Sequence, residues 1–535
     1  MLDIFFPFAG GIGLFLVGMM LLSDGLVAFA GGTVGRALVR FTGTPSKAFV
    51  SGTLVTALVQ SSTATTVTLI GFVSAGLITF SQAIGVVIGA SLGNTATGWI
   101  VAELGLKVNL GFYTLPLIGI GAMLKLLAPA REAALGMSLA GFGLMFLGLN
   151  TLQEGMRGLS AIASLANLPD GGYSARIVAM LIGLAMTAIL QSSSAAIATT
   201  LTALHTAAIN FEQASALVVG ASIGTTLTGA LAAIGGNIYA RRTALAYILF
   251  NSVAGLIAIV LLPVFLFLID LAGRYVGLQP GATSLAAFHT LFIAVGASLF
   301  LPFTPRFGQI VERILPDRDD SMTQRLDQSL LALPAVALEA SQRALEQVTG
   351  RLLDFYSHLL SSGASASQNG GLMQAGQSLE RTYDFVSRIQ LSPDDARLGA
   401  RRIAQLHSID HLLRFHGRLH DLAQAGIDFS DPDYAWAIEN SREMLALARQ
   451  GLAEKNLAPG LERLELDAVT LAALSRQVRH DLLQDMASPA TALRKTDAYR
   501  WMERTGHHIW RVCHYLSQGR PIDVKESPQA NPNQG

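Results

Sequence analysis

Long apolar stretches, separated by short polar segments, fill the first 310 residues of the chain. A helix needs about 20 apolar residues to cross a bilayer, and several of these stretches reach that length. They lie near residues 5–29, 50–78, 83–102, 110–128, 134–152, 177–208, 213–235, 244–270 and 284–304. The pattern predicts an all-α, polytopic membrane helical bundle with about nine spans, and fewer if some segments enter and leave on the same side.

A different pattern begins near residue 320, where polar residues predominate and apolar residues recur at the helical period. Two apolar stripes illustrate it, one formed by Leu345, Val348, Leu352 and Leu353 and the other by Leu406, Ile409, Leu412 and Leu413. The Ser/Gly-rich residues 361–371 predict a loop between two long helices, and Asp431–Pro432 predicts a turn. We therefore expect a second helical bundle over residues 320–518. A disordered tail rich in Pro, Asn and Gln is expected at residues 519–535.

Charged residues are unevenly distributed between these two regions. The chain has 37 Lys and Arg and 37 Asp and Glu, and only 20 of these 74 residues lie in residues 1–310. The asymmetry indicates lipid around the first region and water around the second. The net charge of zero gives no reason to expect nucleic acid as a partner. The one cysteine, Cys513, excludes an intramolecular disulfide and is consistent with a reducing compartment.

Lys and Arg in short loops predict the orientation in the membrane, because they favour the cytoplasmic side. They follow both the first and the last span, as Arg36, Arg40 and Lys47 in the first case and Arg306, Arg313 and Arg318 in the second. This places the N-terminus outside and the C-terminal domain in the cytoplasm. The first apolar run exceeds the roughly 7–15 residues of a signal-peptide core, so we interpret it as a retained membrane helix.

The membrane region contains an internal repeat. A shift of 131 positions aligns Thr56–Ala64 with Thr187–Ala195 and continues without a gap until Gly89–Thr95 lies over Gly220–Thr226. Roughly half of the aligned positions are identical, so we place two copies around residues 44–102 and 175–235. Duplicated halves with polar, interrupted segments are typical of secondary transporters. Whether the copies form an inverted repeat depends on the number of crossings between them, which the sequence leaves open.

Each copy carries a dense polar cluster inside an apolar run. The clusters are Gln60, Ser61, Ser62, Thr63, Thr65 and Thr66 in the first copy and Gln191, Ser192, Ser193 and Ser194 in the second. Unsatisfied polar groups in hydrocarbon cost several kcal/mol each, so the clusters are expected to face protein, water or cargo. Close helix packing by small residues is the alternative explanation for any single serine. It explains less well two Gln-Ser-Ser sequences at one register.

The chemistry of these clusters suits a compact oxyanion and a sodium ion. Phosphate needs hydrogen-bond donors on many sides, and hydroxyls, amides and the N–H groups of a half-helix N-terminus provide them. Sodium needs oxygens, which hydroxyls, Gln carbonyls and unwound backbone provide. Neither cluster contains a basic residue, so the sodium ion itself would supply positive charge beside the anion.

At these residues the chain resembles the sodium/phosphate cotransporter family, which includes the type II animal carriers and bacterial relatives. Each repeat of that family has a Gln-Ser-Ser-Ser-like motif that forms the substrate and sodium site. Gln60–Thr63 and Gln191–Ser194 match it, with Thr63 in place of the last Ser. A downstream Gly-x-Asn-Ile-Gly-Thr-like stretch is matched with Ser91 and Ser222 in place of the Asn. The resemblance covers about residues 1–310.

The resemblance implies sodium-coupled phosphate symport by alternating access in a bacterial inner membrane. The residues expected to bind phosphate are Ser61, Ser62, Ser192, Ser193 and Ser194. Those expected to bind sodium are Gln60, Thr63, Gln191, Thr95 and Thr226. Membrane lipid is the expected surrounding, and no cofactor other than the coupling ion is expected. Walker, His-Glu-x-x-His and Gly-x-Ser-x-Gly motifs do not occur in the sequence, so we do not expect an enzyme.

The C-terminal region is similar to PhoU-like domains, which are three-helix bundles linked to phosphate regulation. Ser408–His411 and Arg504–Ile509 resemble the Arg-x-Gly-Asp-His-like turns of that family, with His507 in place of Asp. Phosphate-response regulators are the partners that this implies. Only Glu380 with Asp384 has the Glu/Asp-x-x-x-Asp spacing of PhoU metal sites. Histidines four apart, His407 with His411 and His416 with His420, are explained better by solvated helix faces, so no metal is expected.

Two other functions remain open. The chain could export phosphate or carry another small anion, because motifs do not encode the direction of transport. It could also be a membrane-tethered phosphate sensor that signals through the C-terminal bundle.

Overall fold

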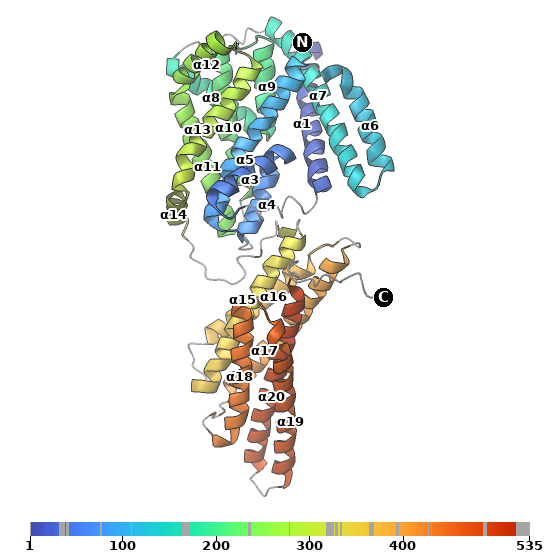
Figure 1. Ribbon diagram of the computed structural model, residues 1–535, viewed down its shortest axis with the longest axis vertical. Coiled ribbons are helices and arrows are strands. Elements are labelled where there is room, and N and C mark those ends of the chain that lie inside the picture. Colours follow the sequence, from blue (N-terminus) through green and yellow to red (C-terminus); the bar gives the residue numbers. More distant parts are fainter. Residues whose placement is uncertain are drawn as a thin grey trace, which may run out of the picture. The chain divides into compact units, whose positions relative to one another are not determined.

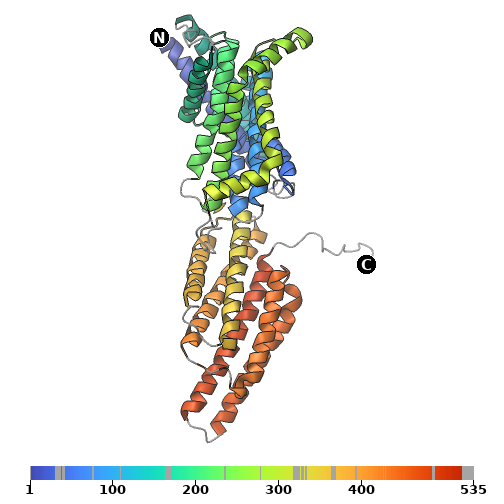
Figure 2. The same ribbon diagram turned by 90° about the vertical axis from the view of Figure 1, so that its left-hand side faces the viewer.

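The computed structural model describes residues 2–30, 38, 42–74, 78–108, 110–162, 172–233, 237–277, 279–316, 326, 330–331, 334–362, 369–391, 395–425, 427, 429, 431–484 and 489–520. The chain divides into two compact units, Met1–Asp317 and Arg318–Gly535, each with its own apolar core. Every regular element among the described residues is a helix (Figures 1 and 2), which confirms the predicted all-α fold.

The first unit consists of membrane-type helices. In chain order they are α1 (Leu2–Ala30), α3 (Pro45–Val59), α4 (Ser62–Ser74), α5 (Phe80–Trp99), η1 (Ile100–Lys107), η2 (Leu110–Tyr113), α6 (Thr114–Leu127), α7 (Ala130–Ile162), α8 (Gly172–Leu190), α9 (Ser193–His205), α10 (Phe211–Ala232), α11 (Ile238–Val260), α12 (Leu262–Val276), α13 (Ala282–Phe300), η4 (Leu301–Phe303) and α14 (Thr304–Ile314). Seven of the described helical segments are long and apolar enough to cross a membrane. The chain is therefore a multi-pass membrane protein, as its pattern predicts.

The number of uninterrupted spans is smaller than the predicted nine. Residues 50–78 are not one helix, because the chain breaks at Gln60 between α3 and α4. With 15 residues, α3 is about 22 Å long at 1.5 Å per residue, less than the roughly 30 Å of a bilayer core. Residues 110–128 hold only the 14-residue helix α6. The stretch 177–208 is likewise broken, at Gln191 between α8 and α9. Hydropathy measures length and apolarity but does not detect these breaks.

The break at Gln60 turns the chain back on itself. Glycines of α5 lie directly against the backbone of α3, Gly85 beside Pro45 and Gly89 beside Phe49, so the two helices run parallel. A Cβ atom on Gly89 would lie 2.0 Å from the Phe49 carbonyl oxygen, a distance that only glycine allows. Since α3 and α5 run in the same direction, α4 must return between them. The α3–α4 pair is therefore a helical hairpin with Gln60 at its tip.

The second copy has the same local structure 131 positions later. Gly220 of α10 lies beside Met180 of α8, and a Cβ atom there would lie 1.8 Å from the Met180 carbonyl oxygen. Gly224 approaches the Leu184 carbonyl oxygen in the same register. The α8–α9 pair is thus a second hairpin, with Gln191 at its tip. Each copy consists of a hairpin followed by a long helix parallel to the first arm.

Helix α1 is held against α7 by glycines at seven-residue intervals. Gly11, Gly18 and Gly25 meet the α7 backbone, and Gly141 and Gly148 of α7 meet α1 in return. A Cβ atom on Gly18 would lie 2.3 Å from the Met145 backbone nitrogen. The contacts progress in opposite directions along the two helices, so the pair is antiparallel. This packing fixes the rotation of α1 about its axis, which decides what its opposite face meets.

The second unit is built from α15 (Pro334–Ser362), α16 (Asn369–Ser387), α17 (Ala396–Gln424), η7 (Pro432–Tyr434), α18 (Ala435–Ala453), η8 (Ala458–Gly460), α19 (Leu461–Gln484) and α20 (Pro489–Gly519). The first predicted stripe, over Leu345–Leu353, is buried in its core, as are Ile409 and Leu412 of the second. Leu413 is 37% exposed. Asp431 caps η7 at the predicted turn.

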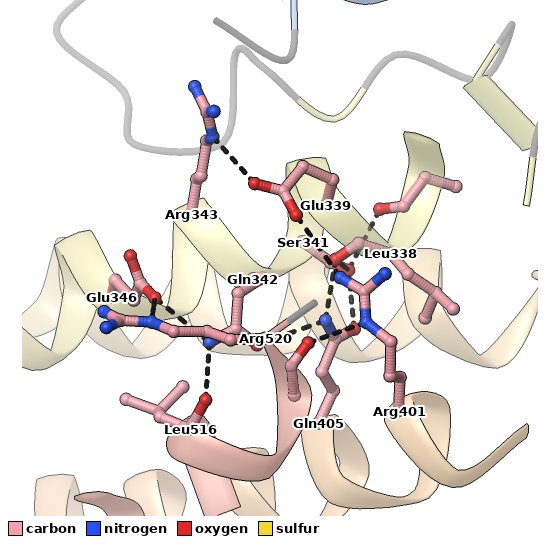
Figure 3. Close-up of polar contacts among 12 residues, drawn as sticks. Leu338, Glu339, Ser341, Gln342, Arg343, Glu346, Arg401, Gln405, Leu516 and Arg520 are labelled. Atoms are coloured by element: carbon pink, nitrogen blue, oxygen red, sulfur yellow. Dashed lines mark hydrogen bonds and ion pairs between the residues drawn. The ribbon is translucent and has the colours of Figure 1, made fainter. Parts of the chain in front are cut away.

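A buried polar network joins α15, α17 and the end of α20 (Figure 3). Arg401 Nε donates to the Gly519 carbonyl oxygen at 2.8 Å, and Arg401 Nη2 lies 3.3 Å from Glu339 Oε2. Gln342 Nε2 donates to the Leu516 carbonyl oxygen at 2.9 Å. These bonds satisfy carbonyls that a helix C-terminus leaves without a partner. Burial lowers the pKa of Arg401, and the Glu339 carboxylate opposes that shift.

Two sequence predictions fall largely outside the described residues. Residues 363–368 of the predicted loop at residues 361–371 lie outside the described residues. Helix α15 ends before them at Ser362, and α16 begins after them at Asn369. Of the predicted tail at residues 519–535, residues 521–535 lie outside. Gly519 is the last residue of α20, and Arg520 Nε lies 2.7 Å from Glu346 Oε1.

Candidate functional site

Both Gln-Ser stretches line one cavity of about 340 Å³ in the first unit. Besides the two hairpin tips, α1, α5 and α10 contribute to its wall. The lining residues are Leu16, Val17, Met19, Met20, Ser23, Asp24, Gln60, Ser61, Ser62, Thr63, Asn94, Leu190, Gln191, Ser192, Ser193, Ser194, Thr225 and Thr228. The structure therefore brings together eight of the ten residues that the sequence suggests for ion binding.

The remaining two, Thr95 and Thr226, are not among the residues that line the cavity. The Thr95 hydroxyl donates to the Leu92 carbonyl oxygen of its own helix at 2.7 Å, and Thr226 does the same with Ile223 at 2.7 Å. Successive residues of a helix are rotated by about 100°. It is accordingly Asn94, the residue before Thr95, that reaches the cavity.

The two hairpin tips share one backbone geometry. Gln60 and Gln191 have φ angles of 58° and 51°, in the left-handed region. This conformation ends the first helix of each hairpin and costs a non-glycine residue about 1–2 kcal/mol. Each Gln side chain folds back and donates from Nε2 to the carbonyl oxygen three residues earlier, Ala57 or Ala188, at 2.5 Å. Such strain at a polar break is typical of functional sites.

The serine after each glutamine caps the second helix of its hairpin. The Ser61 hydroxyl oxygen accepts from the Ala64 backbone N–H at 3.1 Å, and the Ser192 hydroxyl oxygen accepts from Ala195 at 3.2 Å. A serine oxygen that accepts in this way keeps its own hydrogen available for donation. Both capping serines line the cavity, so these hydrogens are available to a bound anion.

The N-termini of α4 and α9 both open onto the cavity, because their first residues, Ser62 and Ser193, line it. In Figure 1, α4 lies in the lower part of the first unit and α9 in the upper part, so the two helices leave the cavity in opposite directions. A helix N-terminus carries free N–H groups and about half a positive charge. Lys, Arg and His are absent from the described lining residues, and these helix ends provide positive potential there.

Two hydrogen bonds fix the tips from α5. Asn94 Nδ2 donates to Ser193 Oγ at 3.2 Å, which joins the first copy to the second. The Thr97 hydroxyl donates to Gln60 Oε1 at 2.9 Å, within the first copy. The position equivalent to Asn94 is Thr225, and its hydroxyl donates to the Ala221 carbonyl oxygen of its own helix instead. The two halves of the site are therefore similar but not identical.

Sequence reasoning missed five polar residues of the cavity: Ser23, Asp24, Asn94, Thr225 and Thr228. The last three belong to the aligned copies, so the repeat could have indicated them. The signal for Asp24 was an acidic residue inside the apolar run at residues 5–29, which in a membrane helix suggests function.

The histidines and acids of the second unit do not assemble a metal site among the described residues, where no group of three or more His, Cys, Asp or Glu could hold an ion. Asp384 lies 3.6 Å from Arg388, and the His407 ring stacks on Tyr515. The two segments with PhoU-like turns do meet, since His411 Nδ1 lies 3.1 Å from His508 Nδ1. The likeness to PhoU domains stays a prediction.

Comparison with known proteins gives one family for the first unit. The protein-family model described as Na+/Pi-cotransporter matches residues 14–154 and 160–309 of this chain. The "Uncharacterized protein YqeW" of Bacillus subtilis (strain 168) is 34% identical over 307 residues, 56% of this chain and 95% of that protein. The "Putative inorganic phosphate export protein YjbB" of Escherichia coli (strain K12) is 29% identical over 337 residues, 62% of this chain and 60% of that protein.

A shorter match reaches an animal carrier. The "Sodium-dependent phosphate transport protein 2C" of Rattus norvegicus is 36% identical over 108 residues, 19% of this chain and 18% of that protein. No solved structure gives a significant match.

Proposed function

The chain belongs to the Na+/Pi-cotransporter family, and from this premise we propose that it carries inorganic phosphate together with sodium across a membrane. Family membership points to a transporter rather than an enzyme. The proposed substrate site is the cavity at the two hairpin tips. There Ser61, Ser62 and Ser192–Ser194 would donate hydrogen bonds to phosphate.

The observation that carries this proposal is the meeting of two half-helix N-termini at one cavity. The first residues of α4 and α9 line it together with the hydroxyls of both copies. Two such ends supply free N–H groups and about one positive charge in total, and none of the described lining residues is basic. A compact oxyanion is the ligand that this environment favours over a neutral solute.

Sodium would bind beside the phosphate. The two motifs offer the side-chain carbonyls of Gln60 and Gln191 and the Thr63 hydroxyl at the cavity, and the backbone carbonyls at the two breaks would add to them. A hard cation prefers such oxygen ligands. Thr95 and Thr226 lie outside the cavity, so we propose Gln60, Thr63 and Gln191 as the primary sodium ligands. Transport would proceed by alternating access, with the two hairpins exposing the site to opposite sides.

Export is the second candidate, because the first unit is similar to YjbB, whose name refers to phosphate export. Flux measured under sodium and phosphate gradients of both signs distinguishes the two directions. We further propose that the protein resides in a bacterial inner membrane with its second unit in the cytoplasm. There the second unit would gate the carrier or report to a phosphate-response system.

The test uses the purified full-length protein in proteoliposomes, with radiolabelled phosphate and an imposed sodium gradient. Ser62→Ala and Ser193→Ala should abolish sodium-dependent flux while the protein stays folded. Ser298→Ala is the matched control, because its hydroxyl is exposed and bonds only to the Ala294 carbonyl oxygen. Undiminished flux in the two site variants would reject the site. Saturable phosphate binding without flux in the wild type would favour the sensor function instead.

A further inference from the structure

Asp24 is the one ionisable side chain among the described residues that line the cavity. It lies on α1, on the same helical face as Val17 and Met20, which also line the cavity. The glycines at positions 18 and 25 face α7 instead. The close packing of these glycines therefore holds the Asp24 face of α1 toward the two hairpin tips.

The Asp24 side chain is exposed, and no described residue forms an ion pair with it. The ion pairs of the first unit involve other acids, such as Glu103 with Lys107 and Glu212 with Arg176. No described residue donates a hydrogen bond to Asp24. An ionisable residue within a membrane helix is costly unless it has a partner or a function. None of the described lining residues is basic, so no described side chain of the cavity offers Asp24 a positive charge.

A carboxylate beside an oxyanion site poses an electrostatic problem. The potential of two helix N-termini favours one anion, but Asp24 and phosphate repel each other if both are charged. A cation bound to the carboxylate removes this repulsion and replaces it by attraction. Asp24 would then make phosphate binding depend on prior occupation by the cation. Such dependence is what couples two solutes in one transport cycle.

We propose that the Asp24 carboxylate binds a coupling sodium ion in the cavity, next to the phosphate. This rests on the function proposed above and adds a ligand that the two sequence motifs do not contain. Ser23, the neighbouring residue on the cavity wall, offers a hydroxyl oxygen for the same ion. Carboxylate and hydroxyl oxygens form the kind of ligand set that a hard cation prefers.

The test measures phosphate flux by the full-length protein in proteoliposomes over a series of sodium concentrations. Asp24→Asn should raise the half-maximal sodium concentration by about tenfold or more, because the charged ligand is lost. Asp24→Glu should restore much of the wild-type sodium response. Asp3→Asn is the matched control: Asp3, which is exposed like Asp24, lies in the first turn of the same helix but not among the residues that line the cavity.

Binding of radiolabelled sodium to the detergent-solubilised protein keeps the proposal testable if Asp24→Asn abolishes flux. The variant should bind less sodium than the wild type, both with and without inorganic phosphate. Wild-type sodium binding or an unchanged sodium response would overturn the proposal. So would a variant that loses only the pH dependence of flux, since the cation would then be a proton. If the wild type itself shows no sodium-dependent phosphate flux, the proposed function fails, whatever the variant does.

Discussion

The side-chain amide of Asn94 donates a hydrogen bond to the hydroxyl oxygen of Ser193, 3.2 Å away at the first residue of α9. Both side chains are buried, and they come from different copies of the repeat. Because Asn94 is the donor, the Ser193 hydrogen remains free to point into the cavity. The first copy thus orients a hydroxyl of the second toward the proposed anion.

Asn94→Asp should weaken phosphate binding. An aspartate at this position would accept the Ser193 hydrogen and add negative charge at the cavity, so the anion would lose a donor. We expect the phosphate concentration for half-maximal flux to rise by about tenfold or more, which corresponds to about 1.4 kcal/mol or more. Asn94→Ala, which removes the orienting donor without adding charge, should have a smaller effect. An unchanged phosphate dependence in both variants would contradict the orienting role.

Gln60 combines a backbone role and a side-chain role, and two substitutions separate them. Gln60→Gly keeps the left-handed conformation at no steric cost but removes the amide that Thr97 contacts. Its thermal stability in detergent should stay close to the wild type, while sodium-dependent flux falls. Gln60→Val should destabilise the protein by about 1–2 kcal/mol, because a β-branched residue is strained at a φ of 58°. Full sodium-dependent flux in Gln60→Gly would argue against a sodium ligand at this side chain.

The repeat let the sequence group residues that the structure brings to one cavity, because positions 131 apart adopt the same local structure. Gln60 and Gln191 are both left-handed, and Gly89 and Gly220 both contact a backbone carbonyl. Periodicity also predicted the helical character of both units. Hydropathy could not indicate the hairpins, because a polar break inside an apolar run has the same composition whether the chain continues or turns back.

The missed residues have a common physical cause. Asp24 lies outside the aligned copies, and only the rotation of α1 against α7 turns it toward the cavity. Asn94 lines the cavity and its neighbour Thr95 does not, because successive residues of a helix are rotated by about 100°. The direction in which a helical side chain points depends on how the helices pack against one another, and a single sequence does not show this packing.

The contact between Gly220 and Met180 should tolerate no side chain. A Cβ atom at position 220 would lie 1.8 Å from the Met180 carbonyl oxygen, so Gly220→Ala must separate α8 from α10. We expect a loss of stability of about 2 kcal/mol or more, measured as thermal unfolding in detergent. Gly119→Ala is the matched control in α6, because nothing lies within 4 Å of a Cβ atom there. That control should be neutral or stabilising by up to about 1 kcal/mol. Equal stability of the two variants would refute the close packing.

The His411–His508 contact predicts that the second unit loses stability in mild acid. Burial, and then the positive charge of His411, lowers the pKa of His508 to about 4 from its ordinary value of 6.5. Burial also lowers the pKa of His411. Because the unfolded chain binds these protons more readily than the folded one, the free energy of unfolding is highest above pH 6.5. It should fall as the pH drops from there toward 4.

Amide hydrogen exchange of α17 and α20 in the full-length protein measures this effect. Between pH 7.5 and pH 5 we expect the opening free energy, corrected for intrinsic exchange, to fall by about 2 kcal/mol for His508. His508→Gln cannot be protonated, so its pH dependence should be flatter even if the variant is less stable at neutral pH. His358→Gln, at an exposed position of α15, should keep the wild-type slope. A wild-type slope in His508→Gln would mean that other groups cause the acid sensitivity, since no proton could then be taken up at position 508.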